Sequence, residues 1–312
     1  MRKFRHLYGP VPSRRLGRSL GVDLVPYKIC TYDCIYCQIG KTTQKTPIRR
    51  EYVPVKEVLN EVRLFLKEEA SSIDHLSLSG SGEPTLYSRI RSVIEGIKKM
   101  TSIPIAVITN GSLLYLEEVR QDLLSADIVL PSLDAVSSEI FFRINRPSQG
   151  FSVENVIEGL VEFRKNYKGQ IWLEILFCKG VNDSQDELMG MKKAIERIQP
   201  DRIHLNTVVR PPSDKWVLPL NQKEMEEVRA FFGEKASIIS EFGHHPSTLS
   251  ERNIKDEILE ILKRRPLSLS DLSDGMGIPK NELNQYIEPL VREGKIHLRV
   301  FSGSVYYEVS HG

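Results

Sequence analysis

The stretch Cys30-Thr31-Tyr32-Asp33-Cys34-Ile35-Tyr36-Cys37 holds three of the four cysteines in the chain. It follows a strand-like run, Ser19 to Pro26, so a loop there could gather three thiolates around a soft metal centre. Clustered cysteines without a disulfide framework indicate metal or redox chemistry rather than chance packing of thiols. A tetrahedral zinc site would need a fourth ligand, and no further Cys or His lies nearby in the sequence. The stretch therefore predicts a three-thiolate site with one open metal position.

The composition is that of an ordinary globular protein. Of the 312 residues, 40% are hydrophobic and 27% are charged, and the formal net charge of +2 says little about partners. The basic start is not followed by an apolar signal core, and no apolar run is long enough to span a bilayer. We therefore expect no membrane contact and a cytoplasmic location, where the reducing conditions suit clustered thiols.

Strands alternate with helices over most of the chain. The expected strands after the cysteine loop are 74–79, 105–110, 127–133, 170–178 and 202–210. The expected helices are 55–69, 88–99, 115–124, 137–142, 153–167, 184–198 and 222–232. This alternation predicts an α/β fold with parallel pairing and right-handed crossovers. We expect a partial or closed parallel (β/α)6-type barrel over residues 1–250.

The strand 170–178 separates its side chains into two faces. Every second residue from Ile171 to Phe177 is apolar and suits packing under helices, whereas Glu174 lies on the other face. Polar residues recur on that second face in other strands, namely Ser77, Ser79, Ser132, Asp134, His204 and Asn206. Burying them without partners would be costly, so a polar ligand is expected at the carboxyl ends of the strands.

The cysteine spacing, with Tyr36 just before the last cysteine, resembles the radical S-adenosylmethionine (radical SAM) superfamily. The resemblance implies a [4Fe-4S] cluster on Cys30, Cys34 and Cys37, whose fourth iron binds S-adenosylmethionine (SAM). It also implies an enzyme that cleaves SAM reductively to a 5′-deoxyadenosyl radical, which abstracts hydrogen from a substrate. An electron donor such as flavodoxin or ferredoxin is then an expected partner.

Within this resemblance, several further residues acquire roles. Gly82-Glu83-Pro84 looks like the glycine-rich motif that engages the methionyl amino group of SAM, with Ser81 where a second glycine is common. Ser132 and Asp134 stand where ribose contacts are usual. Asn110 ends a strand and is either part of a plain turn or a cofactor contact. The full set of expected cofactor contacts is Tyr36, Ser81, Gly82, Glu83, Asn110, Ser132, Asp134, Glu174 and Asn206.

A wider pattern over roughly residues 7 to 245 is similar to one branch of the superfamily. The segments 8–17, 144–147, 179–183 and 210–212 look like radical enzymes grouped with the wyosine synthases of transfer RNA. Wyosine synthases proper carry more cysteines for a second cluster, and here only Cys178 remains. An RNA base and a peptide or protein are therefore both open as substrates.

Three further groups have two interpretations each. Arg14 and Arg15 lie in a predicted loop, Tyr8 to Gly17, and Arg18 directly follows it; the three form either a solvated basic loop or a clamp for an anion. Cys178 is either a buried apolar residue or a catalytic thiol that donates hydrogen or contacts substrate. Glu174 is a charged group on the inner face, and could bind SAM or act on the substrate.

Residues 251–312 follow a different pattern. Helices are expected from Ile254, over 268–276 and over 279–292, followed by a hairpin around Ser302-Gly303. This order resembles a winged helix-turn-helix domain, and Pro289 predicts a kink or an early end in its third helix. From Ile254 onward, eight Lys or Arg stand against nine Asp or Glu, which argues against tight binding of duplex DNA.

The sequence is compatible with two alternative functions, one enzymatic and one regulatory. The first is a radical SAM enzyme with an unidentified substrate. The alternative is an iron-sulfur sensor of iron or redox state that uses the winged helix to bind nucleic acid. The polar inner face and the Gly-Glu-Pro turn favour the enzyme, because a sensor needs neither.

Overall fold

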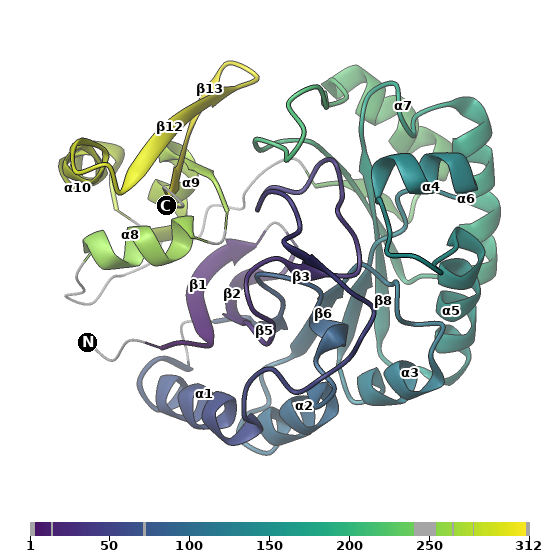
Figure 1. Ribbon diagram of the computed structural model, residues 1–312, viewed down its shortest axis with the longest axis horizontal. Coiled ribbons are helices and arrows are strands. Elements are labelled where there is room, and N and C mark those ends of the chain that lie inside the picture. Colours follow the sequence, from purple (N-terminus) through teal and green to yellow (C-terminus); the bar gives the residue numbers. More distant parts are fainter. Residues whose placement is uncertain are drawn as a thin grey trace.

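The computed structural model describes residues 4–13, 15–70, 73–239, 254–263, 265–276 and 278–309. Residues 4–239 form an α/β main unit, and residues 254–309 form a small C-terminal unit that lies beside it (Figure 1). The predicted domain boundary at residue 250 and the predicted clamp residue Arg14 lie outside the described residues. No helix in the described ranges has both the length and the apolar character needed to cross a bilayer.

The main unit is built on one eight-stranded sheet. All neighbouring strands are parallel except β1 and β2, which pair antiparallel at one edge. The order is open, since it starts at β1 and ends at β10, and the barrel is therefore partial. Across the sheet the strands are β1 (Leu7–Ser13), β2 (Gly17–Val22), β5 (His75–Leu78), β6 (Ile105–Thr109), β7 (Ile128–Pro131), β8 (Gln170–Phe177), β9 (Arg202–Thr207) and β10 (Ala236–Ile238).

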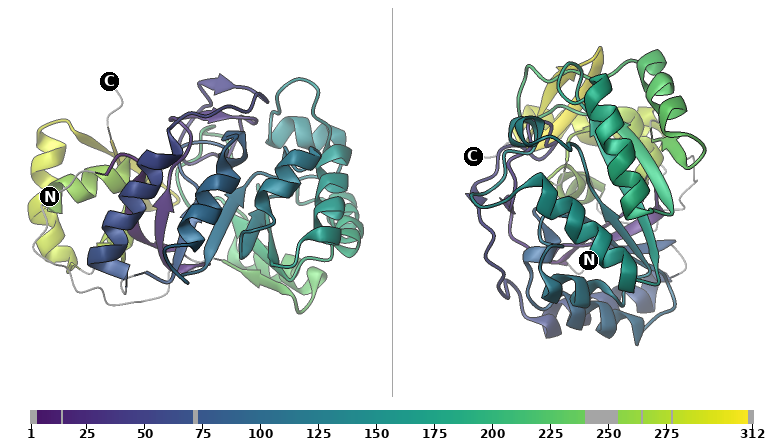
Figure 2. Two further views of the ribbon diagram at one scale, coloured as in Figure 1. Left: turned by 90° about the horizontal axis from the view of Figure 1, so that it is seen from below. Right: turned by 90° about the vertical axis from the view of Figure 1, so that its right-hand side faces the viewer.

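Helices cover the outer, convex face of this sheet (Figures 1 and 2). They are α1 (Val55–Glu69), α2 (Ile90–Lys98), α3 (Glu117–Leu123), α4 (Ser138–Ile144), α5 (Val153–Asn166), α6 (Gln185–Ile198) and α7 (Gln222–Phe232). Their bounds follow from local signals. Ser184 caps α6 by accepting from Glu187 N, and Asn221 forms a capping box at the start of α7. The helix predictions are confirmed to within two residues at each end.

The loop predicted over Tyr8 to Gly17 is wrong in its first part, because Leu7–Ser13 forms strand β1. Pro10 lacks a backbone donor, but β1 is the edge of the sheet, where a missing donor costs no ladder bond. The register between β1 and β2 shifts between Tyr8 and Val11, at this proline. Gly9 and Pro10, which suggested a loop, instead lie in an irregular edge strand.

The predicted division of side chains between the two faces is confirmed. Ile171 and Leu173 of β8 are buried in the core under the helices. Trp172 points the other way and packs on Leu16, Ala106, Ile128 and Leu130, which fill the inner face in the first half of the strands. The polar residues Ser77, Glu174 and Asn206 lie further along, toward the carboxyl ends.

The C-terminal unit has its own apolar core and packs on β1. Its elements are α8 (Ile254–Leu262), β11 (Leu267–Ser268), α9 (Leu269–Met276), α10 (Lys280–Arg292), β12 (Ile296–Phe301) and β13 (Ser304–Val309). Three helices and a hairpin were predicted, whereas the short β11 was not. Pro289 lies inside α10, which does not end early but continues to Arg292. The winged-helix assignment stays a prediction.

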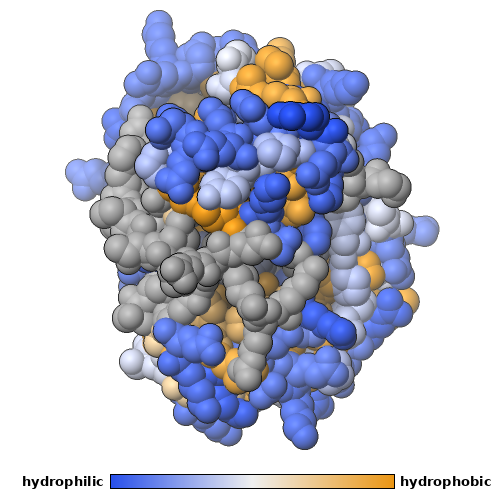
Figure 3. Space-filling model, turned by 90° about the vertical axis from the view of Figure 1, so that its left-hand side faces the viewer, coloured by the Kyte–Doolittle hydropathy of each residue, from blue (hydrophilic) through white to orange (hydrophobic). Residues whose placement is uncertain are grey.

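Both units contribute to the contact between them. Val11 of β1 is buried in the C-terminal core. The hydroxyl of Tyr306 donates to Val209 O over 2.7 Å, and Arg299 donates to Pro212 O over 2.9 Å. These bonds place the hairpin against the segment that follows β9. The face that this unit turns outward is mostly hydrophilic, with a hydrophobic patch near its top (Figure 3).

Candidate functional site

The cysteine loop lies at the carboxyl end of the sheet. Cys30 ends β3 (Ile29–Cys30), which pairs with β4 (Gln44–Lys45), and Cys34 and Cys37 follow in turns. The backbone of Ile35 donates to Ile144 O over 3.0 Å, which ties the loop to the end of α4. All three thiols are half-buried.

Each of the three sulfurs accepts a hydrogen bond from a nitrogen donor. Lys28 Nζ lies 3.1 Å from Cys37 Sγ, Asn110 Nδ2 lies 3.6 Å from Cys30 Sγ, and Asn145 Nδ2 lies 3.5 Å from Cys34 Sγ. The lysine is 2% exposed, although a buried ammonium is costly unless it has a partner. Donors of this kind stabilise thiolates and tune iron-sulfur clusters.

The donor set in this loop consists of three thiols. In the described ranges, no group of three or more His, Cys, Asp or Glu is placed to hold one metal ion. The thiolates of an iron-sulfur cluster bind different irons, so they need not converge on one point. Three thiols on one short loop are a donor set that a cluster of this kind would accept, and the three cysteine ligands stay a prediction.

Burial is the main cause that raises the pKa of Cys30 to about 12, and the charge of Glu83 adds to this rise. Burial likewise raises the pKa of Cys34. These two thiols are therefore protonated at neutral pH in the metal-free chain, and metal binding must release protons.

The turn after β5 presses closely on the cysteine loop. A Cβ added to Gly82 would lie 2.0 Å from Ile29 O, so only glycine fits between the two segments. Next to it, the Glu83 carboxylate accepts from Thr85 N at 3.0 Å, Thr109 Oγ1 at 2.6 Å and Asn110 N at 2.8 Å. Glu83 thus joins this turn to the end of β6, and its predicted contact with SAM remains a prediction.

Two other residues that were predicted to contact SAM, Ser81 and Asp134, are hydrogen-bonded to neighbouring residues. The Ser81 hydroxyl donates to Asp23 Oδ2 over 2.6 Å. Asp134 accepts from Leu176 N at 2.9 Å, and also from Asn145 and Tyr36. These bonds connect the ends of β7 and β8 with the cysteine loop.

Other polar groups line a cavity of about 260 Å³ beside Tyr36 and Cys37. Glu174 forms an ion pair with Arg15 and accepts from Asn206 Nδ2 at 3.1 Å. All three residues line this cavity. The backbones of Ser132 and Glu174 pair in an isolated parallel β-bridge, but Ser132 does not line this cavity. The structure therefore brings Tyr36, Glu174 and Asn206 together beside Cys37.

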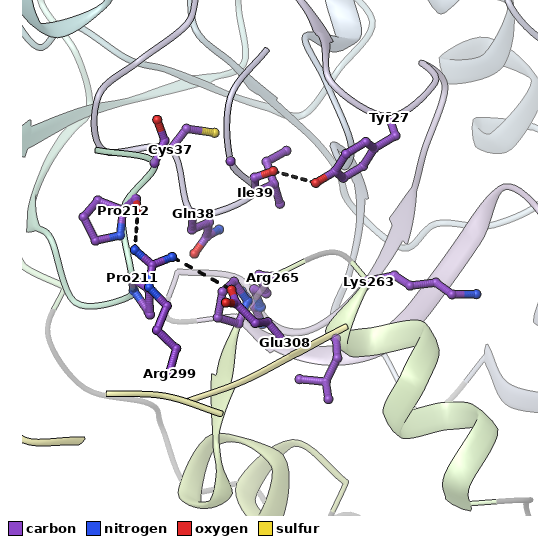
Figure 4. A pocket seen from close by; sticks show the side chains of 14 residues that line it. Tyr27, Cys37, Gln38, Ile39, Pro211, Pro212, Lys263, Arg265, Arg299 and Glu308 are labelled. Carbon is purple, nitrogen blue, oxygen red and sulfur yellow. Dashed lines mark hydrogen bonds and ion pairs between the residues drawn. The ribbon is translucent and has the colours of Figure 1, made fainter. Parts of the chain in front are cut away.

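A second cavity of about 150 Å³ lies between the cysteine loop, the segment after β9 and the C-terminal unit. Figure 4 shows Cys37, Gln38 and Ile39 on one side of it, with Arg265 and Arg299 opposite. The C-terminal unit therefore reaches the immediate surroundings of Cys37. Sequence patterns gave no sign of this contact.

Cys178 is fully buried in the apolar core and lines neither of these two cavities. Burial raises the pKa of its thiol far above the usual range. Its backbone amide donates to Asn182 Oδ1 over 2.8 Å. The charge of nearby Asp134 adds to the rise in the pKa of the thiol, so Cys178 lies close to one candidate residue, but it reaches neither cavity, and its catalytic role stays a prediction.

Three residues near the site were not among the predicted site residues, namely Lys28, Asn145 and Arg265. Asn145 belongs to the segment 144–147 that carried the family resemblance, and this was the signal that could have identified it. Lys28 lies two residues before the first cysteine, but nothing in the sequence shows that its side chain turns inward. Arg265 lies far along the chain and reaches the cavity only through the packing of the two units.

Comparison with known families gives the class of protein. A model described as "Radical SAM superfamily" matches residues 24–191, a range that contains the three cysteines and the Gly-Glu-Pro turn. The chain therefore belongs to the radical SAM superfamily, whose members use a [4Fe-4S] cluster and SAM. The predicted superfamily and cofactors are confirmed, while the wyosine-synthase branch remains a prediction.

Within the superfamily, the chain groups with proteins named UPF0026. It is 33% identical to UPF0026 protein MJ1312 of Methanocaldococcus jannaschii over 96% of this chain and 94% of that protein. It is 37% identical to a UPF0026 protein of Helicobacter pylori over 85% of this chain and 86% of that protein. It is also 36% identical to a Brachyspira hyodysenteriae protein named GTPase Obg, over 99% of this chain but only 46% of that protein.

Solved structures support the fold alone. A radical SAM methyltransferase from Sphaerobacter thermophilus superposes with a TM-score of 0.55 at 14% identity, covering 70% of this chain and 65% of that one. Streptococcus suis SuiB bound to its precursor peptide SuiA superposes with a TM-score of 0.54 at 14% identity, covering 72% and 50%.

Proposed function

We propose that this chain is an enzyme that cleaves SAM reductively and abstracts hydrogen from a substrate, with its cluster on Cys30, Cys34 and Cys37. The observation that carries the proposal is the set of three half-buried thiols, each hydrogen-bonded to its own nitrogen donor, beside a polar cavity. When bound, the cluster supplies the electron that splits SAM into methionine and a 5′-deoxyadenosyl radical.

The residues of the chain position the cofactors and exclude water. Lys28, Asn110 and Asn145 orient the thiolates and adjust their charge. Gly82 lets the turn after β5 approach the cysteine loop. Tyr36, Glu174 and Asn206 line the adjoining cavity, where they would orient SAM or substrate. Ser81, Glu83, Asn110, Ser132 and Asp134 complete the proposed SAM contacts from the surrounding strand ends.

The C-terminal unit, proposed as a winged-helix domain, covers this site rather than binding duplex DNA. Its hairpin bonds to the segment after β9, and its Arg265 lines the cavity. The proposed substrates are an RNA base or a peptide or protein, and the proposed electron donor is a flavodoxin or ferredoxin in the cytoplasm.

Anaerobic reconstitution with iron and sulfide, followed by dithionite and SAM, tests the proposal. We expect 5′-deoxyadenosine and methionine from the wild-type chain, and a loss of at least about a hundredfold when Cys34 becomes Ala. Cys178→Ala is the matched control for removing one thiol, because that thiol is buried away from both cavities. A reconstituted cluster that yields no 5′-deoxyadenosine with any reductant would favour the iron-sulfur sensor instead.

A further inference from the structure

Three large apolar side chains are exposed on two elements that pack on the cysteine loop. Phe142 of α4 is 53% exposed, and Trp216 and Leu218, in the segment after β9, are 50% and 56% exposed. Arg143 connects the two elements, because its guanidinium group lies 5.9 Å from the centre of the Trp216 ring. We call these three side chains the apolar patch. Exposed apolar side chains that gather at one place mark an interaction site.

Hydrogen bonds tie both elements of the apolar patch to the cysteine loop. Asp214 N donates to Ile35 O over 3.0 Å, and Ile35 N donates to Ile144 O over 3.0 Å. Ile35 directly follows Cys34, which we expect to hold iron. Trp216 Nε1 in turn donates to Asp214 Oδ2 over 3.1 Å. Only a few residues and hydrogen bonds therefore separate the apolar patch from an expected iron ligand.

The surroundings of the apolar patch are basic. Residues 33–46, 138–147 and 211–218 meet there, through a bond from Lys45 Nζ to Arg146 O and an ion pair between Arg146 and Asp214. In these three segments the cations are Lys41, Lys45, Arg143, Arg146 and Lys215, and the carboxylates are Asp33, Glu139 and Asp214. All of these cations except Arg146 are exposed, whereas Glu139 is the one exposed carboxylate among the three. The rim of the apolar patch is therefore complementary to an acidic partner.

The position of the apolar patch indicates what kind of partner it suits. Phe142, Trp216 and Leu218 line neither of the two cavities beside Cys37. A substrate must enter a cavity to reach the reacting atoms, whereas an electron can pass through a thin layer of protein. The apolar patch therefore suits an electron donor better than an RNA or peptide substrate.

We infer that Phe142, Trp216 and Leu218, with the basic residues around them, form the docking surface for a small acidic electron-transfer protein. This inference rests on the proposed function and specifies where the electron enters. The apolar side chains would form the dry centre of the interface, and the basic rim would steer the acidic partner toward it. When the donor is a flavodoxin, its reduced flavin loses one electron, which reduces the cluster, and no covalent bond forms or breaks.

Calorimetry on the anaerobically reconstituted full chain tests this inference, with an acidic flavodoxin as the probe. We expect Trp216→Ala to weaken flavodoxin binding by about tenfold or more, and Trp216→Phe to lose less. Arg143→Glu and Lys215→Glu should each weaken it by about threefold or more and make it less sensitive to salt. The rate at which reduced flavodoxin bleaches the cluster, measured without SAM, should fall in the same order. Dithionite needs no docking surface and should reduce the cluster of every variant at the wild-type rate.

Lys168→Glu is the matched control for a charge reversal. Lys168 is exposed and lies between α5 and β8, at the amino end of the sheet and so opposite the cysteine loop. An equal loss of flavodoxin binding in this control would overturn the inference, as would unchanged binding in Trp216→Ala. Self-association of the wild type, or tighter binding of an RNA oligonucleotide, that Trp216→Ala abolishes would also overturn it. Formation of 5′-deoxyadenosine with dithionite tests the proposed function separately, so either idea can fail alone.

Discussion

Lys28 brings a buried positive charge to a cysteine that is expected to hold iron. Its backbone has a φ of 57°, in the left-handed region, and its amide donates to Ser81 O over 2.7 Å. Its ammonium group lies 3.1 Å from Cys37 Sγ. Reduction adds negative charge to a cluster, so a nearby cation makes that reduction easier.

We therefore expect Lys28→Met to lower the reduction potential of the cluster by roughly 60 mV, which corresponds to a tenfold change for one electron. A redox titration followed by electron paramagnetic resonance measures this shift. Lys28→Arg keeps the charge and should keep most of the potential. An unchanged potential in the methionine variant, with a full complement of iron, would show that the ammonium has no electrostatic role.

At the scale of single residues, the sequence identified the expected ligands but not the side chains that hydrogen-bond to them. Cys30, Cys34 and Cys37 are recognisable because their spacing is local. By contrast, Asn145 meets Cys34 across more than a hundred positions of chain, so only the folded chain brings these two residues together. Glu174 was recognisable as a charged residue on an inner face, but its ion pair with Arg15 depends on the β1–β2 turn.

At the scale of elements, the turn after β5 packs directly against the cysteine loop. We expect Gly82→Ala to force them apart, because the added carbon would meet the backbone oxygen of Ile29 at 2.0 Å. The variant should bind less than about half the iron of the wild type and lose on the order of 2 kcal/mol of stability. Iron analysis and urea unfolding measure these two effects.

Gly190→Ala in α6 provides a comparison for that substitution. Its added carbon would meet only the side chain of Val136, whose methyl group lies at 2.6 Å, and alanine favours a helix over glycine. Iron content should remain at the wild-type level in this variant. Equal iron loss in both variants would mean that the position of Gly82 has no special importance.

Most elements were predictable because their signals are local. Val58, Val62 and Phe65 recur at helical spacing and all face the core, which fixed α1 from the sequence. Strand β1 was missed, since Gly9 and Pro10 interrupt its pattern and its pairing with β2 is visible only in the fold. The two-residue β11 was missed because it depends on β13, about forty positions later.

At the scale of the whole molecule, the polar inner face makes stability depend on pH. Burial lowers the pKa of His204 from 6.5 to about 4, despite the opposing charge of Glu174. The neutral imidazole is therefore favoured in the folded chain. Its contribution to stability is complete above pH 6.5 and is lost as the pH falls toward 4, because only the unfolded chain takes up the proton in that window.

Between pH 7 and pH 5, this residue should account for about 2 kcal/mol of lost stability. Urea unfolding of the wild type and of His204→Asn at both pH values measures the difference. The asparagine variant should lose less stability on acidification, by about that amount. An identical pH dependence in the two proteins would contradict the assignment of a depressed pKa to His204.

The packing of Val11 in the C-terminal core has a practical consequence for anyone who shortens this protein. A fragment that stops before α8 would uncover Val11 together with the outer rim of β1, the last strand on that side of the sheet. Exposed strand rims with apolar side chains pair readily with other chains. Such a fragment should self-associate during purification. A lack of catalytic activity in it would then reflect aggregation rather than the loss of a catalytic residue.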